Sequence, residues 1–198
     1  MIEVNPYLDQ LTNDTEQIIA FIKTEVMDLD ENQLSYKPDS RKWSILECIE
    51  HMNIATRHYV DIMKVKIPKA LSGERQPLRY YKRGFLGKLC INAMSPTKDG
   101  QIKSHVKTFS RFKPVLAFEK GKSGVIEEFI GLNETLLDQL LKAKHLNVNK
   151  VRIKSGIGSI IRFKLADAMG FVVGHNQRHI IQIKRILNTM PQKTETHI

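Results

Sequence analysis

The chain has 198 residues, which is long enough for one sizeable hydrophobic core but short for two domains of the usual 100–150 residues. Its 41% hydrophobic and 26% charged residues argue against disorder, and its two cysteines, Cys48 and Cys90, exclude a disulfide framework. Residues 1–6 lack the features of a signal peptide, and no stretch approaches the roughly 18 apolar residues of a membrane span. We therefore expect a soluble cytoplasmic protein with one domain over residues 1–198.

The net charge of +10 arises from one part of the chain. Residues 64–113 contain 13 Lys and Arg against two acids, so the remaining 148 residues carry a net charge of −1. A DNA-binding domain more often spreads its bases along a recognition element that also holds polar base-reading residues. Nucleic-acid binding by residues 64–113 is therefore the less favoured interpretation, and a solvated connection is the favoured one.

The apolar spacing predicts a first helix over residues 6–27, with Pro6 in its first turn. A second helix is predicted from residue 45 to about residue 66. Ser44 and Glu47 form a capping-box pattern at its start, and Pro68 is expected to end it.

Residues 68–121 form a basic insertion rich in proline and glycine, with one short amphipathic helix expected over residues 85–94. A third helix is predicted over residues 123–144. After a loop that contains Gly156 and Gly158, a fourth is predicted over residues 165–189. No segment alternates as a strand would. Four helices with one apolar stripe each predict an all-α four-helix bundle with a long, basic crossover between the second and third helices.

Histidines on two predicted helices point to a metal site. His175 and His179 are four residues apart and share a helix face with Ile183, so both rings should point into the bundle. His51 lies on the apolar face of the second helix beside Cys48. Three imidazoles from two facing helices would leave coordination positions open, as catalytic metal sites do. The alternative is a set of buried, hydrogen-bonded core histidines.

Two segments of the chain resemble motifs of the DinB-like family. Residues 42–52 (KWSILECIEHM) are similar to its Trp-Ser-x-x-Glu-x-x-x-His segment, and residues 174–183 (GHNQRHIIQI) are similar to its terminal HxxxHxxQ motif. The resemblance implies a four-helix bundle with a long crossover and a divalent metal ion held by His51, His175 and His179. The family includes bacillithiol S-transferases and mycothiol-dependent isomerases.

From these features we expect a metal-dependent enzyme. Its bound ion, zinc or nickel, would activate a low-molecular-weight thiol for transfer to an electrophile, or water for hydrolysis. The alternative is a non-catalytic metal-binding bundle, or a basic protein that binds nucleic acid or another partner through residues 64–113. The resemblance and the opposite charges of the first helix and the crossover also favour a homodimer.

Other residues near the two motifs have more than one interpretation. Glu47 is a candidate catalytic base, or else a cap with a surface ion pair. Gln182 is a candidate catalytic residue that would hydrogen-bond a ligand or a metal-binding imidazole. His58, about 10 Å along the helix from His51, should line the cavity or the core. Cys48 is expected to be an inert buried thiol, and Trp43 an anchor in the core or at the end of the bundle.

Overall fold

The computed structural model describes residues 1–73, 76–97, 99–102, 107–115, 117–158 and 160–191. Most of these residues are helical, and the chain-order elements are β1 (Ile2–Glu3), α1 (Val4–Glu25), α2 (Glu31–Ser35), α3 (Ile45–Leu71), β2 (Tyr80–Tyr81), α4 (Phe85–Met94), the 3-10 turn η1 (Ser110–Phe112), α5 (Ala117–Ala143), β3 (Arg152–Lys154), β4 (Arg162–Lys164) and α6 (Leu165–Thr189). None of the described helices is both long and apolar enough to cross a membrane.

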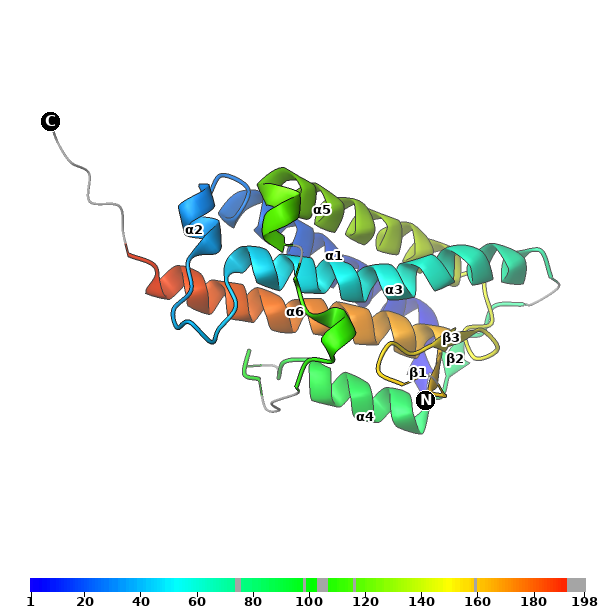
Figure 1. Cartoon of the computed structure of the whole chain (residues 1–198). Coiled ribbons are helices and arrows are strands. Elements are labelled where there is room, and N and C mark those ends of the chain that lie inside the picture. The colour runs from blue at the N-terminus through cyan, green and yellow to red at the C-terminus, as the bar shows by residue number, and fades with distance from the viewer. Residues whose placement is uncertain (74–75, 98, 103–106, 116, 159, 192–198) are drawn as a thin grey trace, which may run out of the picture.

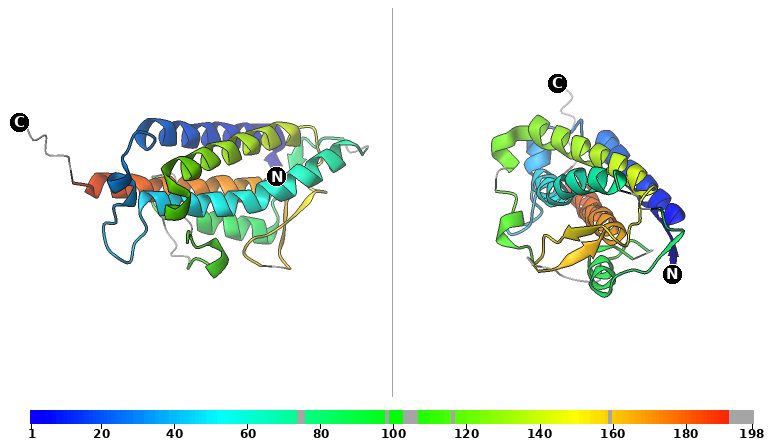
Figure 2. Two further views of the ribbon diagram at one scale, coloured as in Figure 1. Left: turned by 45° about the horizontal axis from the view of Figure 1, so that its top comes forward. Right: turned by 90° about the vertical axis from the view of Figure 1, so that its right-hand side faces the viewer.

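The four long helices α1, α3, α5 and α6 form a four-helix bundle, which confirms the predicted fold class (Figure 1). Helix α3 packs against α5 and α6, and α1 packs against the same two helices (Figure 2). Their apolar stripes meet in one core, whose fully buried side chains include Leu8, Ile22, Ile49, Met52, Phe129, Leu140 and Ile183. The helix spacing in the sequence therefore correctly identified the faces that pack together.

The predicted capping box starts α3. The Ser44 hydroxyl accepts a hydrogen bond from the Glu47 backbone N–H at 3.2 Å, and Glu47 Oε2 accepts one from the Ser44 N–H at 2.8 Å. These bonds satisfy two backbone donors that the first helical turn would otherwise leave without partners. The cap fixes where α3 begins, and thus which face presents His51.

The prediction that Pro68 ends the second helix is wrong. Helix α3 continues through Pro68 to Leu71, and the Ser72 N–H still donates to the Pro68 carbonyl at 3.1 Å. Proline removes its own backbone donor and crowds the carbonyl four residues earlier, but here it lies in the last turn of the helix, so few helical residues follow it. Ile67 and Ala70 are buried in the core, and this packing favours one further turn.

The expectation that no segment forms a strand is also wrong. Two small antiparallel sheets are present, β1–β2 with Ile2 opposite Tyr81 and β3–β4 with Ile153 opposite Phe163. Each strand has two or three residues, which is too short for an alternating pattern to stand out in the sequence. The one-turn α2 escaped prediction for the same reason.

The connection from α3 to α5, residues 72–116, includes β2, α4 and η1. Helix α4 matches the short helix predicted over residues 85–94 and lies alongside α6 (Figure 1). The buried carboxylate of Asp167 on α6 accepts a hydrogen bond from the Gly84 N–H at 2.9 Å. Gly87 also lies against it, since a Cβ there would be 2.6 Å from that carboxylate. Asp167 therefore anchors the start of α4 to the bundle.

Removing the cap of α3 should lower the stability of the whole bundle. We expect Ser44→Ala to reduce the free energy of unfolding by about 1 kcal/mol, because the Glu47 N–H loses its acceptor. Urea unfolding followed by circular dichroism measures the change. Ser72→Ala, at the exposed opposite end of α3, is the control and should change stability by less than about 0.5 kcal/mol. Equal effects of the two substitutions would contradict the role given to the cap.

Candidate metal centre

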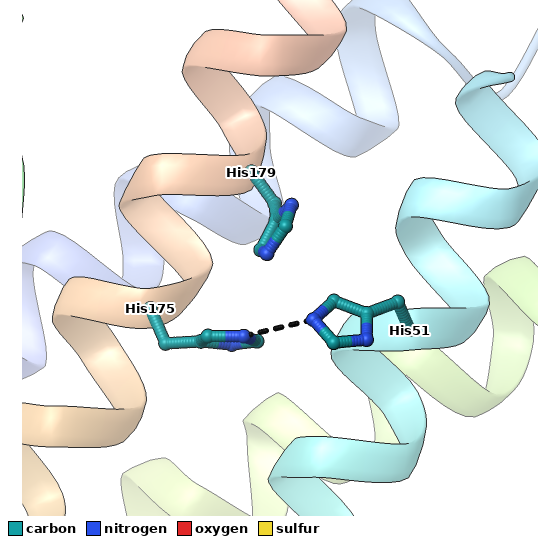
Figure 3. A group of neighbouring side chains, drawn as sticks. All are labelled: His51, His175 and His179. Carbon is teal, nitrogen blue, oxygen red and sulfur yellow. Dashed lines mark hydrogen bonds between the residues drawn. The ribbon is translucent and has the colours of Figure 1, made fainter. Parts of the chain in front are cut away.

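Three histidine rings meet between α3 and α6. His51 projects from α3, while His175 and His179 project from successive turns of α6 (Figure 3). The side chains are 5–7% exposed, and one ring nitrogen from each lies within 4.8 Å of the others. The Nε2 atoms of His51 and His175 are 3.0 Å apart. The inward orientation predicted for all three rings is thus confirmed, and they could hold one metal ion.

Two of the rings are fixed through the nitrogen that faces away from the cluster. His51 Nδ1 lies 2.6 Å from the backbone oxygen of Phe112, and because a carbonyl only accepts, this nitrogen must carry the proton. His179 Nδ1 lies 3.0 Å from Gln182 Oε1 and donates to it. In the neutral rings, Nε2 is then left with its lone pair. Such outer hydrogen bonds are how proteins set the tautomer and orientation of metal-binding histidines.

Burial keeps all three imidazoles neutral at physiological pH. It lowers the pKa of His175 to about 3, with a further contribution from His51. Burial also lowers the pKa of His179 well below its usual value, followed by the effects of His175 and His51. Burial lowers the pKa of His51 as well, although its bond to Phe112 opposes the shift. Neutral imidazole is the form that binds a metal ion, so the electrostatics of the site favour ligation.

The three rings open onto a cavity of about 460 Å³. The Trp43 ring covers one side, with its centroid 4.8 Å from that of His51 and 6.1 Å from that of His179. The other lining side chains are Arg41, Lys42, Ala55, Tyr59, Met94, Thr108, Phe109, Phe112, Ile157, Phe171, Arg178 and Gln182. About half of the lining residues are apolar or aromatic, three are cationic, and none of the described ones is a carboxylate.

The basic crossover lines this cavity with uncharged side chains. Met94, Thr108, Phe109 and Phe112 come from it, whereas the cations Arg41, Lys42 and Arg178 lie outside residues 64–113. Among the described lysines in the second half of the crossover, Lys107 and Lys113 are exposed and do not line the cavity. Lys98 and Lys103 lie outside the described residues.

The two residues predicted as catalytic lie in different places. Gln182 lines the cavity and binds His179, one of the two arrangements expected for it. Glu47 does not line the cavity. Its two oxygens accept from the Ser44 N–H and, at 2.8 Å, from Lys37 Nζ. These contacts match the cap and ion pair that were its alternative interpretation, and a catalytic role for Glu47 stays a prediction.

His58 and Cys48 lie apart from the three rings. His58 is half-buried, and its Nε2 donates to the Lys154 carbonyl at 3.2 Å instead of joining the cluster. Cys48 is fully buried, and burial raises the pKa of its thiol. The thiol therefore stays protonated at neutral pH, as expected for an inert buried cysteine.

Sequence reasoning missed several residues of the site. Trp43 packs against the core, as expected, but its position beside His51 and His179 was not predicted. Phe112 contributes a backbone carbonyl, which every residue type has. The amino acid at this position therefore gives no indication of the role. Arg178 could have been found, because it lies between two histidines of one motif.

Comparison with known families identifies the fold. A model of the DinB superfamily matches residues 15–183, which include all three histidines. The chain belongs to the DinB superfamily. A search of curated proteins found no match.

A solved structure has a similar fold. The chain is similar to YfiT from Bacillus subtilis, described as a probable metal-dependent hydrolase with an unusual four-helix bundle topology. The TM-score is 0.53 at 17% sequence identity, over 91% of this chain and 86% of YfiT. At this level of identity the likeness establishes a shared bundle architecture.

Acidification should destabilise the metal-free DinB-superfamily protein. The buried histidines stay neutral in the folded state but titrate near 6.5 when unfolded, so the unfolded state binds more protons below that pH. Stability is fully present above about pH 6.5 and falls as the pH drops, by up to about 1.4 kcal/mol per pH unit for each histidine. Urea unfolding between pH 7 and pH 5 measures this slope.

Two variants assign that slope to the cluster. H175Q/H179Q should flatten the pH dependence, whereas His145→Gln should leave it unchanged because His145 is exposed. A double variant with the wild-type slope would show that other groups cause the acid sensitivity.

Removing the partner of His179 should weaken metal binding without unfolding the bundle. We expect Gln182→Ala to raise the dissociation constant for zinc about 10-fold, because the His179 ring loses its orienting acceptor. Competition with a chromogenic chelator measures the constant. Gln10→Ala, on the exposed face of α1, is the control. Unchanged zinc affinity in Gln182→Ala would exclude this positioning role.

Proposed function

We propose that this protein is a metal-dependent enzyme in which His51, His175 and His179 hold one divalent ion at the base of the cavity. The observation that supports the proposal most strongly is the convergence of three buried, neutral imidazoles on one point beside a cavity. A cluster of imidazoles is a typical donor set for zinc and nickel. A hydrogen bond between core histidines would account for the 3.0 Å contact of His51 with His175, whereas a shared ion accounts for the approach of all three rings.

The donors fit such an ion in number, charge and orientation. The rings supply one nitrogen each, and the outward nitrogens of His51 and His179 are occupied by Phe112 and Gln182. Three protein ligands are the usual number at a catalytic zinc site, whereas structural sites usually have four. Within the described residues no cysteine or carboxylate completes the set, which favours a catalytic site.

We infer that the reaction transfers a low-molecular-weight thiol to an electrophile. A divalent ion in this site supplies Lewis acidity, which lowers the pKa of a thiol or of water. In the transfer, the thiol loses its proton, its sulfur forms a bond to the electrophilic carbon, and the leaving group departs with the electron pair of the broken bond. Hydrolysis is the second candidate, because YfiT, which has the same architecture, is described as a probable metal-dependent hydrolase.

The side chains of the cavity favour a small substrate with negative charge. Trp43, Phe112 and Phe171 form apolar walls that exclude water from the reacting groups. Arg41, Lys42 and Arg178 raise the local concentration of anions. These three side chains are the groups that would attract an acidic thiol.

Metal analysis of protein purified without a chelator or a polyhistidine tag tests the proposal. We expect about one ion per chain in the wild type, and a large loss in His51→Ala, His175→Ala and His179→Ala. His58→Ala is the matched control and should retain the ion, because His58 binds a backbone carbonyl outside the cluster. A wild type that takes up neither zinc nor nickel would overturn the proposal.

The reaction is tested separately with the metal-loaded protein. Conjugation of small thiols to electrophiles should require His51 and should show a higher KM for anionic thiols in Arg178→Gln, because the lost charge supplied substrate binding. Turnover of esters or amides alone would favour hydrolysis. Metal binding with no turnover on either panel would favour the non-catalytic bundle, and salt-sensitive binding to DNA or RNA would favour the nucleic-acid interpretation.

A further inference from the structure

The wall of the cavity is joined to one of the three histidines by a backbone hydrogen bond. Phe112 lies in the 3-10 turn η1 of the crossover, and its carbonyl accepts the Nδ1 proton of His51 at 2.6 Å. The turn itself is held by bonds from the Phe112 N–H to Phe109 and from the Lys113 N–H to Ser110. The position of this turn therefore determines where the acceptor for His51 lies.

The Phe112 ring fixes the turn by packing on Gly156. A Cβ at Gly156 would lie 2.7 Å from Phe112 Cζ, a distance that real side chains do not adopt. A side chain at Gly156 would therefore require the Phe112 ring to shift. Gly156 belongs to the loop between β3 and β4, far from the crossover in sequence.

The loop that contains Gly156 is in turn held on α3. The Gly156 N–H donates to the Tyr59 hydroxyl at 3.1 Å, and the Ser155 N–H donates to the Ile161 carbonyl at 2.8 Å. Tyr59 lies eight residues after His51 on the same helix and is fully buried. Gly156 is thus held on α3 by its own N–H, and a side chain added there would displace the Phe112 ring.

We propose that Gly156 and Phe112 are positioning residues for His51. The loop supports the Phe112 ring, the ring fixes the crossover turn, and the carbonyl of that turn holds the His51 proton on Nδ1 so that Nε2 faces His175 and His179. The inference rests on the proposed role of His51 as a metal ligand. It assigns a function to the crossover and to the glycine loop, whose described residues supply none of the three grouped histidines.

The same geometry predicts that the metal site and the crossover stabilise each other. If the bond from His51 to Phe112 raises the affinity for the ion, the bound ion must strengthen that bond by the same factor. Arg111, just before Phe112, is an exposed site for trypsin, whereas Pro114 blocks cleavage after Lys113. Metal binding should therefore slow cleavage after Arg111.

Gly156→Ala tests the proposal most directly. We expect its dissociation constant for zinc to rise at least 10-fold, because the displaced Phe112 carbonyl no longer orients His51. Nitrogen-15 NMR of the histidine rings should show His51 protonated on Nδ1 in the wild type and a changed mixture of tautomers in the variant. Gly131→Ala is the matched control, since a Cβ there meets no atom within 4 Å.

A second substitution separates positioning from a general loss of structure. Phe112→Leu replaces the ring that the new Cβ would strike with a shorter side chain. F112L/G156A should therefore bind zinc more tightly than Gly156→Ala and should regain the wild-type tautomer of His51. If Gly156→Ala alone fails to fold, Phe112→Leu alone should still weaken zinc binding and reduce the protection from trypsin.

The outcomes distinguish this inference from the proposed function. The positioning role would be overturned, and the metal site left intact, if Gly156→Ala bound zinc within twofold of the wild-type affinity. If Gly156→Ala does not fold, the same result in Phe112→Leu would overturn it. A wild type that binds no zinc or nickel would instead overturn the metal site itself. An unchanged His51 tautomer in a variant that binds zinc weakly would also overturn the positioning role.

Discussion

The cost of burying three imidazoles constrains the whole site. Each ring has two nitrogens that need partners, and a buried polar atom without one costs about 1–3 kcal/mol. Phe112 and Gln182 satisfy one nitrogen each on His51 and His179. Of the four remaining nitrogens, one on each ring faces the other two rings, and these three need a shared proton or a shared cation. A divalent ion satisfies all three at once, which is why this arrangement favours a metal site over an ordinary polar core.

The bundle makes this arrangement possible by fixing the two helices that carry the rings. The cap at Ser44 sets the start of α3, and the four-residue spacing of His175 and His179 places both rings on the face of α6 that meets α3. The crossover then returns across the site, anchored by Asp167 at the start of α4 and by Phe112 at the cavity. The long crossover therefore completes the walls of the cavity.

The sequence predicted the features that depend on regular spacing. The apolar stripes located the four long helices, the Ser44 and Glu47 pattern located the start of α3, and the motif around His175 located the inward rings. Features that depend on tertiary contacts could not be found in this way. Strands of two or three residues show no period, and the backbone acceptor in the crossover has no residue signature. The homodimer stays a prediction.

X-ray absorption at the zinc edge tests the central claim, that the three histidines share one divalent ion, most directly. For protein loaded with one equivalent of zinc, the account predicts three imidazole nitrogens at about 2.0–2.1 Å, and the imidazole scattering should fall by one ligand in His175→Ala. A sulfur ligand at about 2.3 Å, or a spectrum unchanged by that substitution, would place the ion elsewhere and contradict the account.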